Sequence, residues 1–181
     1  MIIGITGTLG AGKGTIVEYL VQEYGFKLYS VREFLNKEVK RRGLPTSRDT
    51  LLAVANDLRS IHGPGYISET MMGEVLRDVS DAVIESIRSI GEAKYLTDHG
   101  AQLWAVDADI KTRYARIQER ASETDRVSFE KFSADETREY TNIDGTKPNL
   151  SGVIALADIM LYNDGSREEL FKKIEEVLNA K

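Results

Sequence analysis

The segment Gly7–Thr15, with the sequence GTLGAGKGT, decides the fold of this chain. It contains four glycines and one lysine, it follows the apolar run MIIGIT of residues 1–6, and it precedes the helical pattern TIVEYLVQEYG of residues 15–25. Glycine loses more conformational freedom on folding than any other residue, so this density is costly to order. The pattern predicts a strand, a loop whose bare backbone contacts a ligand, and a helix.

The loop fits the pattern G-x-x-x-x-G-K of a phosphate-binding P-loop, in the strand-to-helix context that this motif requires. Backbone N–H groups and the positive end of the helix bind phosphate oxygens, and the lysine adds a point charge. The dinucleotide fingerprint G-x-G-x-x-G does not fit, because Thr15 stands in place of its third glycine. The predicted donor-nucleotide residues are Gly7, Gly10, Ala11, Gly12, Lys13, Gly14 and Thr15, and Lys13 is also a candidate catalytic residue.

Beyond the loop, short apolar runs alternate with helical patterns along the 181 residues. Strands are expected at 1–6, 26–30, 81–86, 101–107 and 157–163, and helices at 15–25, 31–43, 47–63, 65–80, 109–123, 128–140 and 166–181. Such alternation implies parallel pairing through right-handed crossovers. The sequence therefore predicts one α/β domain over 1–181, a three-layer P-loop NTPase fold with a mainly parallel sheet of about five strands flanked by helices.

The composition excludes several kinds of function. A net charge of −5 argues against a protein whose main task is to coat nucleic acid. The chain has no cysteine, so disulfides, thiolate metal sites and cysteine nucleophiles are excluded. No run approaches the length of a membrane span, and we expect a cytoplasmic protein without a membrane or nucleic-acid partner. The oligomeric state does not follow from the sequence.

The stretch GAGKGT resembles the P-loop of adenylate kinase and related nucleoside monophosphate kinases, in which Gly14 replaces the more usual Ser or Thr after the lysine. This replacement weakens direct ligation of Mg²⁺ by the loop and leaves Thr15 to contact phosphate. The segments LYSVREFLNKEVKRRG (28–43), SRDTLLAVANDLRSIHGPG (47–65), VIESIRSIGEAKYL (83–96) and ADIMLYNDGSREEL (157–170) resemble adenylate-kinase-related proteins of archaea and bacteria. The resemblance runs over most of the chain.

The resemblance implies roles for residues outside the loop. It places acceptor binding on Ser30, Arg32 and Arg88, within a helical insertion at about 31–80 and just after the third strand. It implies a lid at about 113–149, entered by the basic helix RYARIQER (113–120), whose Arg116 and Arg120 are candidate catalytic residues. Arg113 of this helix and Arg126 beyond it are further candidates. It also implies that the adenine base lies near YNDGS (162–166), which makes Asn163 a candidate donor-binding residue. The stretch FSADETRE (132–139) resembles a family pattern F…E…RE without a known chemical role.

Charge considerations support an arginine pocket. Phosphoryl transfer between nucleotides brings several negative charges together, and guanidinium groups neutralise them with bidentate hydrogen bonds. The predicted pocket arginines, each near a turn or strand end, are Arg32, Arg48, Arg59 and Arg88, with Arg59 and Arg88 taken as substrate-binding and Arg88 also as catalytic. Glu85 follows the apolar run AVI, where an acid commonly holds Mg²⁺ through water. Asp107 is interpreted as the N-cap of the helix that begins near Ile110.

The predicted function is an ATP-dependent phosphotransferase that moves the γ-phosphoryl group to a nucleoside monophosphate or similar small nucleotide, with ATP and Mg²⁺ as cofactors. Two alternatives stay open. A dephospho-coenzyme A kinase would need a carboxylate base soon after the second strand, where the chain offers Glu33. A regulatory NTPase would bind a nucleotide without transferring its phosphate to an acceptor.

Overall fold

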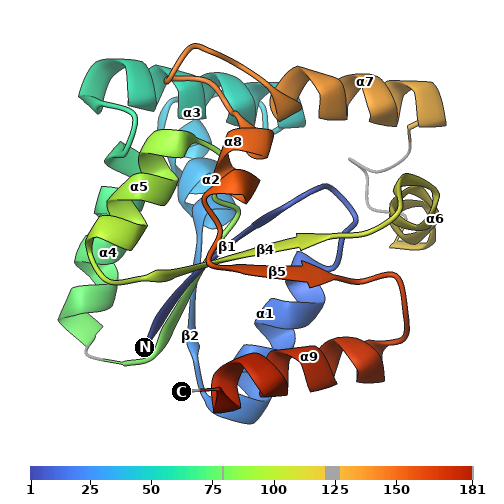
Figure 1. Ribbon diagram of the computed structural model, residues 1–181. Helices are drawn as coiled ribbons and strands as arrows, with labels where there is room; N and C mark the ends of the chain where they lie inside the picture. Colours follow the sequence, from blue (N-terminus) through green and yellow to red (C-terminus); the bar gives the residue numbers. More distant parts are fainter. Residues whose placement is uncertain (79, 121–126, 181) are drawn as a thin grey trace.

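The computed structural model describes residues 1–78, 80–120 and 127–180. Five parallel strands form one sheet in the order β2-β3-β1-β4-β5 (Figure 1). The strands are β1 (Ile2–Gly7), β2 (Lys27–Ser30), β3 (Ala82–Glu85), β4 (Gln102–Asp107) and β5 (Ile159–Tyr162). The helices are α1 (Lys13–Tyr24), α2 (Val31–Arg41), α3 (Arg48–His62), α4 (Tyr66–Asp78), α5 (Ile90–Asp98), α6 (Ile110–Arg120), α7 (Phe129–Tyr140), α8 (Leu150–Ala155) and α9 (Arg167–Asn179). The predicted fold class is confirmed.

Each face of the sheet has its own hydrophobic core, because side chains alternate along a strand. Ile3 and Ile5 of β1 pack with α1 and α9, and Trp104 of β4 is buried on the same side. Leu103 packs on the opposite side with helices α2, α3, α4, α5 and α8. Figure 1 shows these two helical layers around the sheet. The central strand β1 is thus covered on both faces, which fixes the position of the loop that follows it.

The helices that shape the site come from two places in the chain. In the chain, helices α2, α3 and α4 follow β2 and precede β3, within the range of the predicted insertion. Helices α6 and α7 follow β4, and the carboxyl end of α7 lies beside the start of α3, where Arg138 is ion-paired with Asp49 (Figure 1). Parallel strands place their carboxyl ends at one edge of the sheet, so these helices and the P-loop meet there.

The sequence prediction missed two helices, α5 and α8. It assigned no helix or strand to residues 87–100, and none between the loop that ends at residue 149 and the last strand. Helix α5 begins with a capping box, in which the Ser89 side chain accepts from the Glu92 N–H and the Glu92 side chain accepts from the Ser89 N–H. Helix α8 has only six residues and is capped by Asn149. The capping-box signal was present in the sequence, whereas so short a helix leaves no clear periodicity.

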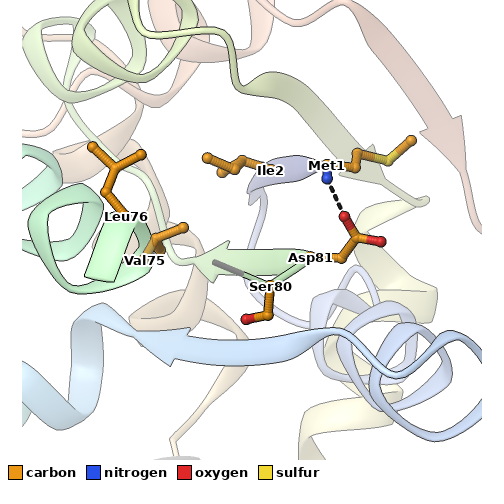
Figure 2. Close-up of a pocket in the computed structure, with 6 residues that line it drawn as sticks. All are labelled: Met1, Ile2, Val75, Leu76, Ser80 and Asp81. Carbon is orange, nitrogen blue, oxygen red and sulfur yellow. Dashed lines mark hydrogen bonds and ion pairs between the residues drawn. The ribbon is translucent and has the colours of Figure 1, made fainter. Parts of the chain in front are cut away.

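The opposite edge of the sheet carries a shallow pocket of about 330 Å³ lined by Met1, Ile2, Val75, Leu76, Ser80 and Asp81 (Figure 2). Met1, Ile2, Ser80 and Asp81 lie at the amino ends of β1 and β3, and Val75 and Leu76 lie on α4, so the pocket is away from the P-loop. Within the described ranges, no helix combines the length and the apolar character needed to cross a bilayer.

Candidate functional site

The P-loop backbone explains its glycines. Gly7, Gly10 and Gly12 have φ values of 137°, 81° and 109°, which side-chain-bearing residues rarely adopt. A Cβ atom would lie 2.0 Å from the Val106 carbonyl oxygen at Gly7, and 2.3 Å from the Asn163 side-chain nitrogen at Gly12. A Cβ atom at Gly14 meets nothing within 4 Å. Three of the four glycines are therefore required by the packing of the loop itself, in addition to any need for close ligand approach.

Lys13 is held at the mouth of the loop. Its ammonium donates to the carbonyl oxygens of Gly7 (2.8 Å) and Thr8 (2.7 Å). Burial of the ammonium, with the Arg88 guanidinium nearby, lowers the pKa of Lys13 from 10.5 to about 7, although the Glu85 carboxylate acts in the other direction. A half-buried cation surrounded mainly by cations favours an anion at this position.

Side chains from β4, β5 and α6 brace the loop. Thr8 donates to the Asp107 carboxylate, and the Asn163 amide donates to the Ala11 carbonyl oxygen (2.8 Å). Arg113 donates to the Leu9 carbonyl oxygen (3.2 Å). The interpretation of Asp107 as a helix cap was wrong.

The cap of α6 is Asp109, whose carboxylate accepts from the N–H groups of Lys111 (2.9 Å) and Thr112 (3.3 Å). The Asp107 carboxylate lies two residues too early for this role. It accepts instead from Thr8 and from the Ala108 N–H, so it ties β4 to the P-loop. Both residues are aspartates near the same turn, and only the fold separates their roles.

A cavity of about 800 Å³ opens beside the loop. Seven arginines and Lys13 line it against four glutamates, in a chain whose net charge is −5. The basic side chains are Lys13, Arg32, Arg48, Arg59, Arg88, Arg116, Arg120 and Arg167, and the acidic ones are Glu18, Glu85, Glu119 and Glu139. Gly10, Gly12, Gly14 and Thr15 also line it. The predicted residues Gly7, Ala11, Ser30 and Asn163 stand behind this lining and support the loop or the strand ends.

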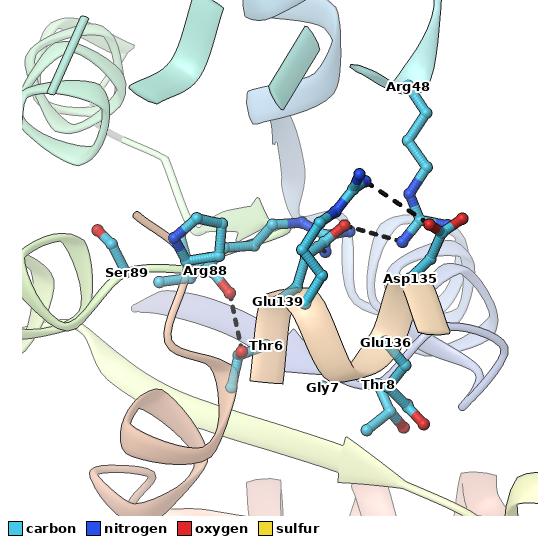
Figure 3. A network of polar contacts seen from close by, with 12 residues as sticks. Thr6, Gly7, Thr8, Arg48, Arg88, Ser89, Asp135, Glu136 and Glu139 are labelled. Atoms are coloured by element: carbon cyan, nitrogen blue, oxygen red, sulfur yellow. Dashed lines mark hydrogen bonds and ion pairs between the residues drawn. The ribbon is translucent and has the colours of Figure 1, made fainter. Parts of the chain in front are cut away.

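Arg48 and Arg88 share one carboxylate. The Glu139 side chain accepts from Arg48 through Oε1 (2.8 Å) and from Arg88 through Oε2, so it bridges α3 and the segment after β3 (Figure 3). Its side chain is 7% exposed, against 28% for Arg48 and 32% for Arg88. Burial alone would raise the pKa of Glu139, but the two guanidinium groups outweigh it and hold the pKa below its usual value.

Arg59 is committed to a buried ion pair. Its Nε donates to Glu92 Oε1 (3.0 Å), and the two side chains are 2% and 0% exposed. The other oxygen of Glu92 accepts from the backbone N–H of Arg88 (3.2 Å). The predicted substrate-binding residue Arg59 thus lines the cavity, and through Glu92 it also fixes the backbone that carries Arg88.

Glu85 lies at the carboxyl end of β3 and lines the cavity. It accepts a hydrogen bond from the predicted residue Ser30 at the end of β2 (2.6 Å). The next residue, Ser86, has a φ of 71°, the left-handed value that a non-glycine residue seldom takes. Among the described residues, no three acidic or histidine side chains gather as a metal site. One carboxylate near a phosphate cradle is nevertheless a fitting donor set for Mg²⁺, which keeps several waters and binds substrate phosphates.

The arginines of α6 separate into two kinds. Arg113 is buried and paired with Glu136, so it supports the P-loop from behind. Arg116 lines the cavity and donates to the Asn163 carbonyl oxygen (2.9 Å), and Arg120 also lines the cavity. Arg126 lies outside the described residues. Glu92, Glu139 and Arg167 were not predicted as site residues. The sequence offered a capping box at Glu92 and the pattern FSADETRE that ends at Glu139, and it gave no signal for Arg167.

The fold and the loop together define a P-loop protein with a kinase-like α/β fold. A family model described as an AAA domain matches residues 3–140. A UPF0200 protein of Thermococcus gammatolerans is 31% identical over 98% of this chain and 94% of its own length. The chain belongs to the AAA domain family of this model and to the UPF0200 proteins.

Solved structures agree with this fold. TT1252 from Thermus thermophilus has a TM-score of 0.66 at 21% identity, covering 99% of this chain and 97% of that one. Shikimate kinase from Bacteroides thetaiotaomicron has a TM-score of 0.61 at 13% identity, covering 99% and 98%. The resemblance to P-loop kinases is confirmed at the level of fold.

Proposed function

We propose that this protein is an ATP-dependent phosphotransferase that moves the γ-phosphoryl group to a nucleoside monophosphate or a similar small nucleotide. The observation that carries this proposal is the convergence of Lys13 and seven arginines on one cavity beside the P-loop of an acidic chain. Two phosphorylated substrates need such a concentration of positive charge, whereas binding of a single nucleotide needs less of it.

The cavity divides into a donor side and an acceptor side. The amides of the P-loop and Lys13 hold the triphosphate of ATP, with Asn163 supporting the loop near the base. Arg32, in the helical insertion of about 31–80, and Arg88, just after β3, hold the acceptor. Arg116 and Arg120 belong to the lid of about 113–149 and stabilise charge on the transferring group.

Catalysis in this arrangement is mainly positioning and electrostatic stabilisation, so no side-chain nucleophile is required. The arginines keep the two polyanions close, and water is excluded when the cavity fills. Glu85 would hold Mg²⁺ through water, and the ion would neutralise charge on the phosphates.

A coupled assay with ATP and a panel of acceptors tests the proposal. The panel contains nucleoside monophosphates, deoxynucleoside monophosphates and dephospho-coenzyme A. Turnover that requires one nucleotide acceptor supports the proposal. Hydrolysis of ATP at the same rate with and without every acceptor contradicts it and favours a regulatory NTPase. The dephospho-coenzyme A alternative needs Glu33 as its base, whereas Glu33 is exposed at the first turn of α2 and does not line the cavity.

A further inference from the structure

The pattern FSADETRE of α7 gains contacts in the structure that give its acidic residues a role. Phe132 is fully buried, and Glu136 pairs with Arg113 behind the P-loop. Glu139, at the end of the pattern, pairs with Arg48 and Arg88 at the cavity. Helix α7 is therefore anchored by Phe132 and Glu136 and reaches the cavity with its last turn.

We propose that the carboxylate of Glu139 occupies the place of an anionic group of the acceptor, a phosphate or a carboxylate, and that the acceptor binds Arg48 and Arg88 by displacing it. This inference rests on the proposed function, because it identifies part of the acceptor site. It adds Arg48 to that site and defines the acceptor as a molecule that carries an oxyanion.

The geometry of Glu139 is that of a bridging oxyanion. Each of its two oxygens accepts from a different guanidinium group, on Arg48 of α3 and on Arg88 after β3 (Figure 3). A phosphate or carboxylate of a ligand makes the same pair of charge-assisted hydrogen bonds. Both arginines line the cavity and are about one-third exposed, so a ligand in the cavity reaches them.

The position of Glu139 allows it to leave. It is the second-last residue of α7, and the helix anchors at Phe132 and Glu136 lie further toward the amino end. The neighbouring Arg138 pairs with Asp49 in a contact that is exposed on both sides, and within the helix it lies 3.7 Å from the Asp135 carboxylate. Loosening of one helical turn therefore frees Arg48 and Arg88 while the buried part of α7 stays in place.

Calorimetry tests the proposal. Inorganic phosphate is titrated into the protein saturated with Mg²⁺ and a non-hydrolysable ATP analogue, and the affinity for phosphate is measured. Glu139→Gln removes the competing charge and is expected to bind phosphate at least about tenfold more tightly than the wild type. Glu130→Gln is the control, because Glu130 is an exposed acid in the first turn of the same helix and does not line the cavity. We expect its phosphate affinity to stay within about twofold of the wild type.

The double variant Glu139→Gln/Arg48→Gln is expected to lose the increase in phosphate affinity, because Arg48 is one of the two guanidinium groups that would bind phosphate. Acetate is titrated in parallel: binding of phosphate alone identifies a phosphorylated acceptor, and equal binding of acetate identifies a carboxylate. Phosphate affinity of Glu139→Gln equal to or below that of the wild type would overturn the proposal, as would an equal gain in Glu130→Gln.

A second measurement needs no variant. In the wild type, saturating phosphate is expected to speed hydrogen exchange of the backbone amides in the last turn of α7, and unchanged exchange there contradicts displacement of Glu139. If the ATP analogue does not bind, the donor site of the proposed function fails. The phosphate comparison is then made in the Lys13→Ala background, where it still decides the role of Glu139.

Discussion

The low pKa of Lys13 predicts how nucleotide binding depends on pH. Lys13 has a pKa of about 7 in the free protein because its ammonium is buried with Arg88, Arg113 and Arg120 nearby, and only Glu85 among its main electrostatic neighbours opposes this shift. Phosphate groups of ATP favour the charged form, so ATP binds the protonated protein and takes up a proton. At pH 7.5 about three quarters of Lys13 is neutral, which corresponds to uptake of about 0.75 proton.

Between pH 7.5 and 9.5 the protonated fraction of Lys13 falls roughly 75-fold, and the apparent dissociation constant of ATP rises by the same factor. The phosphates themselves stay ionised over this range, because their second pKa is near 6. Apart from Lys13, no lysine, tyrosine, histidine or cysteine lines the cavity among the described residues, and the α-amino group of Met1 lies at the other end of the sheet. The effect therefore reports on Lys13.

Calorimetry over this pH range, in pairs of buffers with different ionisation enthalpies, measures both the affinity and the number of protons. Lys13→Arg is the control, since a guanidinium stays charged throughout and the pH dependence should disappear. An affinity for ATP that is constant from pH 7.5 to 9.5, without proton uptake, would refute the assignment of a largely neutral Lys13 to the donor site.

Three further predictions concern the loop and its supports. Gly12→Ala should lower the free energy of unfolding, measured by chemical denaturation, by about 2 kcal/mol or more, because φ is 109° and the new Cβ atom lies 2.3 Å from the side-chain amide of Asn163. Gly14→Ala is the control, because its Cβ atom meets open space; its free energy of unfolding should stay within about 1 kcal/mol of the wild-type value. Arg88→Ala should reduce the turnover number by about 10³-fold with ATP affinity little changed, and a loss confined to ATP affinity would contradict an acceptor-side role. Glu92→Gln should lower the free energy of unfolding by about 3 kcal/mol, because it leaves the buried guanidinium of Arg59 without its carboxylate. A melting temperature equal to that of the wild type would show that this pair does not stabilise the fold.

The parts of the fold that depend on local pattern could be predicted from the sequence. The five strands and the P-loop follow from apolar runs and glycine spacing, and Ser47 and Ser166 cap α3 and α9 as their residue types indicate. The predicted gathering of arginines also agrees with the lining of the cavity.

Contacts between distant segments could not be predicted. Arg59 meets Glu92 across 33 residues, and Arg48 meets Glu139 across 91. No spacing rule links such residues, because only the packing of α3, α5 and α7 brings them together. The same limit explains why an arginine predicted to bind substrate is also part of a buried ion pair.

The role of Asn163 shows a related limit. The family resemblance placed it near the adenine base, and its turn does lie beside the P-loop. Its side chain, however, donates to the Ala11 carbonyl oxygen and is 7% exposed. The position of this residue in the fold was thus more predictable than the hydrogen-bond partner of its side chain.

The central claim is that the P-loop binds the phosphates of a nucleoside triphosphate, and calorimetric titration of MgATP at pH 7 into the wild type and Lys13→Ala tests it most directly. We expect one binding site in the wild type and an affinity at least about tenfold lower in Lys13→Ala, with thermal unfolding of both proteins confirming that the variant is folded. No detectable heat of binding to the wild type for MgATP or MgGTP, or equal affinity of the two proteins, would contradict the claim.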